Sequence, residues 1–150
     1  MDRTDANLTA AIDHTAGEIS RTDNKASLLL ALDGVLVAAV ATLGAHVPAA
    51  ALVLVAVGTV ALVVAVVLGL LVVRPRLTAR DGSNDRSSFV HWATATEEDI
   101  AAGMTEDRRV ARVRVLSGIA LRKMTFLRWT TDATAVAVVT LAAAALVTAA

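Results

Sequence analysis

The residues 49–73, AAALVLVAVGTVALVVAVVLGLLVV, decide the fold class of this chain. They contain no charged residue and no proline. As an α-helix they would be roughly 37 Å long at about 1.5 Å per residue, which exceeds a bilayer hydrocarbon core of about 30 Å. A soluble protein has no use for such a long helix that is apolar on every side, so the stretch predicts a membrane-spanning helix.

Two further apolar blocks, 26–45 and 131–150, flank this stretch in the sequence. The first is not a signal peptide, because about 25 mostly polar residues precede it where a signal peptide has only a short basic start. Unpaired backbone groups in lipid cost several kcal/mol each, so each block must be helical. The sequence therefore predicts an all-α membrane protein. It has three transmembrane helices (26–45, 49–73 and 131–150) and a cytoplasmic helical segment between the second and the third.

The basic residues are distributed unevenly and predict the orientation. Of the 14 Lys and Arg residues, three precede the first block, eleven lie within 74–132, and the short turn around His46 has none. Under the positive-inside rule, residues 1–25 and 74–130 are cytoplasmic and the C-terminus lies outside.

The cytoplasmic parts carry weaker helical signals. Residues 1–25 have one weakly apolar face, and 80–88 form a polar loop without periodicity. Thr96, followed by three acidic residues, predicts a helix start. An apolar stripe at three-to-four spacing predicts a long helix that packs against the N-terminal helix. The alternatives are a helix on the membrane surface and a partner-binding helix. The stripe consists of Val113, Leu116, Ala120, Met124 and Leu127.

Composition and motifs argue against several functions. Lys plus Arg equal Asp plus Glu, so the chain is not a generally basic nucleic-acid binder, and the absence of Cys excludes a thiol nucleophile and a disulfide framework. There is no phosphate-cradling glycine loop, no nucleophile elbow and no His, Asp or Glu set at metal-ligand spacing. We therefore expect no enzyme activity, no cofactor and no metal.

Asp33 is an acidic residue well inside an apolar block, whereas Asp132 stands at the very start of the third block. It lies about seven residues, or roughly 10 Å, from the start of the first predicted span, where a carboxylate costs on the order of 2.5–3.5 kcal/mol. One interpretation is an intramembrane polar switch or ion-pathway carboxylate. The other is a structural contact to another helix or to Arg122, Lys123 or Arg128.

Three stretches resemble the transmembrane Pycsar effector proteins. They are 21–29 (RTDNKASLL) at the entry to the first span, 89–93 (FVHWA) followed by acidic residues, and 115–123 (VLSGIALRK) before the last span. The resemblance extends from about Leu8 to Leu146.

The resemblance implies a role in bacterial antiphage defence. In that family a partner cyclase makes cyclic CMP or cyclic UMP, and the effector then impairs the inner membrane and causes abortive infection. In these residues we recognise no pattern expected for the cyclic-nucleotide-binding module of fuller members. Residues that could contact the signal, or alternatively anchor to lipid head groups, are Arg21, Asp23, Lys25, Arg122 and Lys123.

Three helices per chain are too few to enclose a wide pore. An activity that disrupts the membrane therefore implies a homo-oligomer in the lipid bilayer. Small residues on the second predicted span would permit the close helix contacts that such an assembly needs. The alternative function is a small membrane anchor or scaffold that recruits a cytosolic partner.

Overall fold

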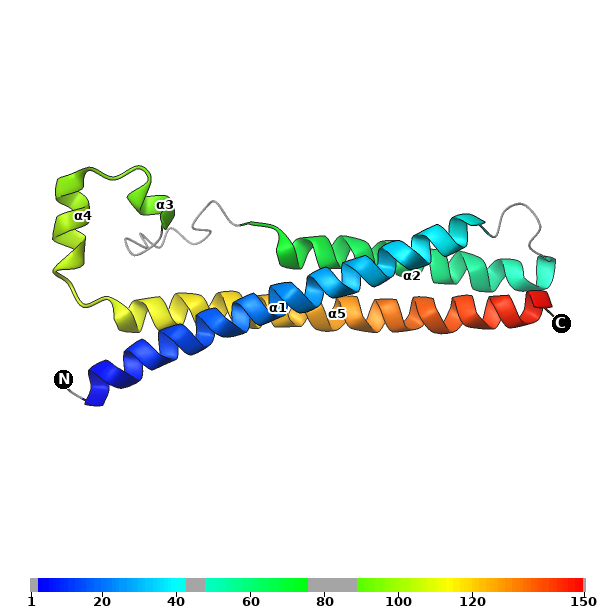
Figure 1. Cartoon of the computed structure of the whole chain (residues 1–150), viewed down its shortest axis with the longest axis horizontal. Helices are drawn as coiled ribbons and strands as arrows, with labels where there is room; N and C mark the ends of the chain where they lie inside the picture. Colours follow the sequence, from blue (N-terminus) through cyan, green and yellow to red (C-terminus); the bar gives the residue numbers. More distant parts are fainter. Residues whose placement is uncertain (1–2, 43–47, 76–88, 150) are drawn as a thin grey trace. The chain divides into compact units, whose positions relative to one another are not determined.

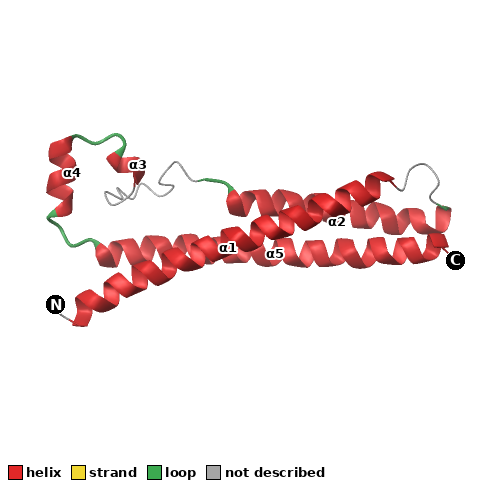
Figure 2. Ribbon diagram, viewed as in Figure 1, coloured by secondary structure: helices red, strands yellow, loops and turns green. Residues whose placement is uncertain are grey.

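The computed structural model describes residues 3–42, 48–75 and 89–149. In these parts every element is a helix, joined by loops, as Figure 2 shows. The helices, labelled in Figure 1, are α1 (Arg3–Thr42), α2 (Ala49–Val73), α3 (Phe89–Trp92), α4 (Glu97–Met104) and α5 (Arg109–Ala149). The predicted turn around His46 and the predicted loop at 80–88 fall outside the described residues.

Three helices, α1, α2 and α5, are long and apolar enough to cross a membrane. This finding confirms the predicted all-α membrane fold class. With 40 and 41 residues, α1 and α5 are about twice as long as a span requires. Each therefore joins a polar helical part and an apolar part without a break, because neither sequence contains a proline that would end the helix.

The chain divides into two compact units. Unit 1 consists of Met1–Ile19 and Pro75–Leu121, and unit 2 consists of Ser20–Arg74 and Arg122–Ala150. Within unit 2, α1 and α5 run in the same direction and α2 runs against them (Figure 1). The segments that enter and leave unit 2 at Ser20, Arg74 and Arg122 therefore do so at one end of that unit.

The inward-facing residues of the three long helices repeat at alternating intervals of three and four. We call these positions the seam. This spacing keeps one face of each helix toward its neighbours, as in a coiled coil. Seam residues of α1 are Leu8, Ile12, Thr15, Ile19, Thr22, Ala26, Leu29, Asp33, Leu36 and Val40. Those of α2 are Ala51, Val55, Gly58, Leu62, Ala65, Gly69 and Val72. Those of α5 are Val113, Leu116, Ala120, Lys123, Leu127, Thr130, Thr134, Ala137, Leu141 and Ala144. All of them are buried or half-buried.

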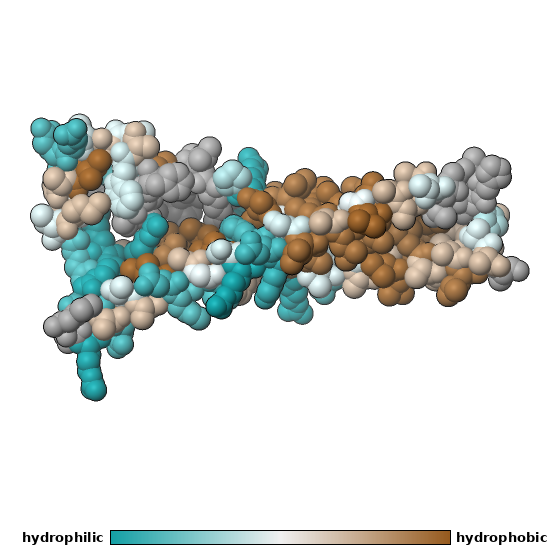
Figure 3. All heavy atoms as spheres, in the orientation of Figure 1, coloured by the Kyte–Doolittle hydropathy of each residue, from teal (hydrophilic) through white to brown (hydrophobic). Residues whose placement is uncertain are grey.

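Much of the outer face of unit 2 is apolar. On α2 alone, Leu52, Val53 and Val60 each expose more than half of their surface. Figure 3 shows hydrophobic residues spread over this part of the molecule. Exposed aliphatic side chains in this number would be unfavourable in water but match hydrocarbon, so the surface agrees with a membrane location.

Local predictions outside the apolar spans are partly confirmed. Thr96 is the N-cap of α4, and its side chain accepts a hydrogen bond from the Asp99 backbone N–H at 3.2 Å. In the predicted stripe, Leu116 and Ala120 are buried, but Met124 is 41% exposed. Lys123 takes the seam position instead, so the prediction was wrong by one residue there. The long aliphatic stem of a lysine can occupy such a position while its ammonium group reaches a partner.

Two glycines of α2 set how closely the helices approach within unit 2. A Cβ atom at Gly58 would lie 2.7 Å from Leu141 Cγ and 2.7 Å from Thr140 Oγ1. A Cβ atom at Gly69 would lie 2.9 Å from Leu30 Cδ2. Gly34, in contrast, has no such neighbour within 4 Å. Lipid tails are as apolar as leucine, so helices in a membrane depend on such close packing for their association.

We expect Gly58→Leu to destabilise the helix bundle by about 1–3 kcal/mol, because the added side chain has no space against α5. Gly34→Leu is the matched control, since it makes the same change in open space. Thermal unfolding of the full chain in detergent, followed by far-ultraviolet circular dichroism, measures both. Equal unfolding temperatures for the two variants would contradict this packing.

Candidate functional site

Asp33 occupies a seam position of α1 and exposes none of its surface. Its Oδ1 atom accepts a hydrogen bond from the Thr134 hydroxyl of α5, with 2.9 Å between the two oxygens. Its Oδ2 atom has no hydrogen-bond partner among the described residues. Because a carboxyl group can take part in several hydrogen bonds, this one is only partly satisfied inside unit 2.

The contact to Asp33 therefore comes from a hydroxyl on another helix and not from a basic side chain. Sequence reasoning missed Thr134 as the partner, because the rotation of α5 about its axis decides which of its residues meets Asp33. Thr130, one seam position earlier, is also fully buried, but its hydroxyl donates to the Phe126 carbonyl of its own helix at 2.9 Å. Of these two buried threonines, Thr134 is therefore the one that donates to Asp33.

Asp23 and Lys123, both named from the sequence, are brought together by α1 and α5. The Lys123 Nζ atom lies 2.5 Å from Asp23 Oδ1. The Lys123 side chain is only 12% exposed, so its ammonium group is largely shielded from solvent. A shielded ion pair that loses one partner leaves an uncompensated charge, so this contact favours one register of α1 against α5.

The other basic residues named from the sequence do not join this pair. The Arg122 guanidinium carbon lies 5.9 Å from the centre of the Phe126 ring, a cation–π contact within α5. Phe126 also makes an edge-to-face contact with Trp129, with 5.7 Å between ring centres. Arg21 and Lys25 are exposed on α1.

Lys25 borders a groove of about 370 Å³ in unit 2. The groove is lined by Thr22 and Lys25 of α1 and by five residues of α5: Met124, Leu127, Arg128, Thr131 and Asp132. Of these seven residues, sequence reasoning named only Lys25 as a signal contact, with Arg128 considered as a partner of Asp33. The groove combines two basic side chains with an apolar lining.

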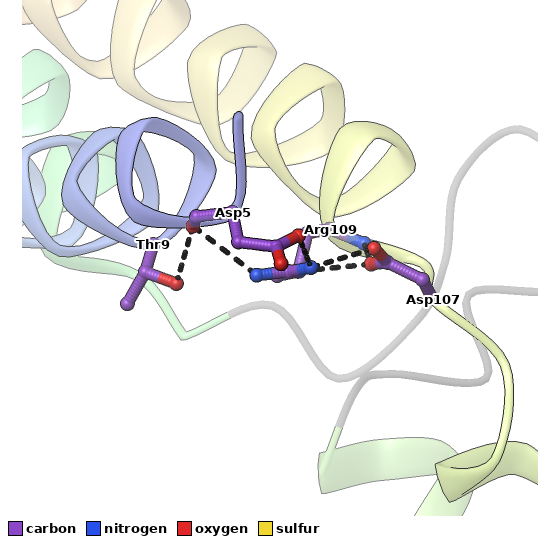
Figure 4. Close-up of polar contacts among 4 residues, drawn as sticks. All are labelled: Asp5, Thr9, Asp107 and Arg109. Carbon is purple, nitrogen blue, oxygen red and sulfur yellow. Dashed lines mark hydrogen bonds and ion pairs between the residues drawn. The ribbon is translucent and has the colours of Figure 1, made fainter. Parts of the chain in front are cut away.

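Unit 1 holds a separate cluster of charges around Arg109 (Figure 4). Its Nη2 atom lies 2.5 Å from Asp5 Oδ1 on α1 and 2.7 Å from Asp107 Oδ2. Its Nη1 atom donates to the Asp5 carbonyl at 3.1 Å. The side chain thereby ties the start of α5 to the start of α1.

Asp107 also accepts a hydrogen bond from the Arg109 backbone N–H at 3.1 Å, which satisfies one free donor at the start of α5. The hydrogen bonds from Arg109 lower the pKa of the Asp107 carboxyl group from 3.8 to about 2. The two carboxylates in turn raise the pKa of Arg109. Since the carboxylate is favoured in the folded state, its contribution to stability is present above pH 3.8 and is lost as the pH falls toward 2.

The arrangement of charged side chains limits the chemistry that the described residues can perform. Among the residues that the structure describes, no group of three His, Asp or Glu side chains could hold a metal ion. Two ion pairs, Arg109–Asp5 and Lys123–Asp23, instead connect α1 and α5. Such pairs can fix or change how two helices pack, which is the property expected of a conformational site.

A comparison with known protein families gives one result. Residues 7–150 match the model of the Pycsar effector protein domain, which is nearly the whole chain. The match confirms the resemblance found in the sequence. Searches of curated proteins and of solved structures found no match.

Proposed function

The chain belongs to the Pycsar effector protein family, and on this premise we propose that it impairs the inner membrane in response to a cyclic pyrimidine nucleotide. The outcome is death of the infected cell before phage is released, that is, abortive infection. The signal is cyclic CMP or cyclic UMP made by a partner cyclase. The chain acts by changing its packing in the membrane and carries out no catalysis.

The observation that best supports this proposal is the contact between Asp33 and Thr134. It places a partly satisfied carboxyl group inside a bundle of helices that are otherwise suited to lipid. A polar group in this position is expensive and usually serves a function. A second packing of α1 against α5 would give Asp33 other partners, so the carboxyl group can act as a polar switch between two states.

The proposed orientation follows from the distribution of charge. Residues 1–25 and 74–130 face the cytoplasm, where the nucleotide would be made, and the C-terminus faces outward. The ion pair between Asp23 and Lys123 then lies near the cytoplasmic face of the membrane. A signal that competes for either partner would reach the α1–α5 contact directly.

The described residues of one chain contribute three candidate spans, which are too few to enclose a wide pore. We therefore propose that the active form is a homo-oligomer in the bilayer. The exposed apolar face of α2 is available for contacts with lipid or with other copies.

The direct test is expression of the chain with its partner cyclase in bacteria that contain a membrane-potential dye. We expect loss of potential and of viability when the cyclase is active. A cyclase with its catalytic residues removed is the matched control and should leave the potential intact. If the potential survives with an active cyclase, the proposal is wrong, and the membrane anchor or scaffold becomes the better interpretation.

A second test removes the hydrogen bond of the switch. Thr134→Val keeps the shape of the side chain but leaves Asp33 Oδ1 without its donor. Hydrogen bonds between membrane helices average about 0.6 kcal/mol, so we expect a roughly threefold shift toward the active packing. The measurement is the loss of membrane potential at low cyclase expression.

Thr148→Val is the control for this variant, because Thr148 is exposed and its hydroxyl donates within its own helix, to the Ala144 carbonyl. Its sensitivity to the cyclase should equal that of the unaltered chain. If Thr134→Val also leaves the sensitivity unchanged, Asp33 has only a structural role.

A further inference from the structure

The groove of unit 2 lies where the charged parts of its two helices end. Lys25 is the last basic residue of α1 and Arg128 is the last basic residue of α5. Beyond them the only charged residues of these helices are Asp33 on α1 and Asp132 on α5. In a helix that enters a bilayer, this is the level of the lipid head groups.

The two basic side chains of the groove differ from the neighbouring cations Lys123 and Arg122. Lys123 pairs with Asp23, and Arg122 stacks over Phe126. Lys25 and Arg128 are both exposed, and neither forms a hydrogen bond or ion pair with another described residue. Both charges therefore remain available to an anion.

The remaining lining limits the kind of anion. Asp132 follows Arg128 by one helical turn, so the groove carries a net charge of +1 from Lys25, Arg128 and Asp132. This balance suits a monoanion better than a dianion such as a phosphate monoester. Met124 and Leu127 add an apolar surface for the body of a ligand. The groove is open to its surroundings and has a volume of about 370 Å³.

We propose that this groove binds a phosphodiester. The guanidinium group of Arg128 would contact the two non-bridging oxygens, and the ammonium group of Lys25 would add a second charge-assisted hydrogen bond. Anionic phospholipids and cyclic nucleotides both carry this monoanionic group. Binding of an anionic phospholipid in the groove does not depend on the proposed function, whereas binding of a cyclic nucleotide there rests on it.

The test compares two probes with the full chain purified in detergent. Native mass spectrometry counts bound phosphatidylglycerol, with diacylglycerol as a control that lacks the phosphodiester. Equilibrium dialysis measures bound cyclic CMP, with cytidine as the corresponding control. The variant is the double substitution Lys25→Gln and Arg128→Gln, which neutralises both groove cations.

The matched control is the double substitution Arg3→Gln and Arg114→Gln, two exposed residues of α1 and α5. It removes one positive charge from each of the same two helices, but neither residue lines the groove. Circular dichroism checks that both variants keep their helix content. We expect the groove variant to weaken binding of at least one phosphodiester probe by about tenfold or more, and the control variant to weaken it less than about twofold.

Each result has a defined meaning. A loss confined to phosphatidylglycerol assigns the groove to lipid, a loss confined to cyclic CMP assigns it to the nucleotide, and a loss of both supports a general phosphodiester site. Equal losses in the two double variants, or binding of neither probe above its phosphate-free control, would overturn the proposal. A chain that still depolarises the membrane with an active cyclase but binds no phosphodiester would refute this site and leave the proposed function standing.

Discussion

The packing of α1 against α5 through unbroken seam spacing is the constraint on which the rest of the structure depends. In lipid there is little hydrophobic drive between helices, so their association needs close contact and polar partners. The seam supplies both in unit 2. Small residues such as Ala26 and Ala137 are fully buried, and the Asp33–Thr134 hydrogen bond and the Asp23–Lys123 ion pair connect the two helices.

This constraint also explains why the polar groups lie where they do. At the depth of Asp33, a carboxyl group on the outer face would meet hydrocarbon, whereas in the seam it meets Thr134 of the neighbouring helix. Glycines at Gly58 and Gly69 allow α2 to pack closely on the other two helices. Because the carboxyl group of Asp33 is only partly satisfied, alternative packings of the same helices could lie close in free energy. That property supports a role as a membrane effector.

Much of the fold could be predicted from the sequence because membrane spans are a local property. The charge-free run 49–73 is apolar on every side, and Thr96 precedes three acidic residues, so each identifies its own helix without reference to the rest. The partner of Asp33 and the groove beside Lys25 could not be predicted in the same way. They depend on how α1 and α5 are rotated about their axes, and a shift of one residue replaces Met124 by Lys123 in the seam. Family membership was available from the sequence, because its motifs are short and contiguous.

The chain contains no cysteine, so introduced cysteines can measure the central contact without background. Leu36 and Ala137 are corresponding seam positions of α1 and α5, three residues beyond Asp33 and Thr134. With Leu36→Cys and Ala137→Cys, oxidation of membranes should form an intramolecular disulfide. The pair Leu36→Cys and Val139→Cys should not form this disulfide, because Val139 is exposed on the outer face of α5. Equal cross-linking of the two pairs, or cross-linking of the Val139 pair alone, would contradict the parallel seam of α1 and α5.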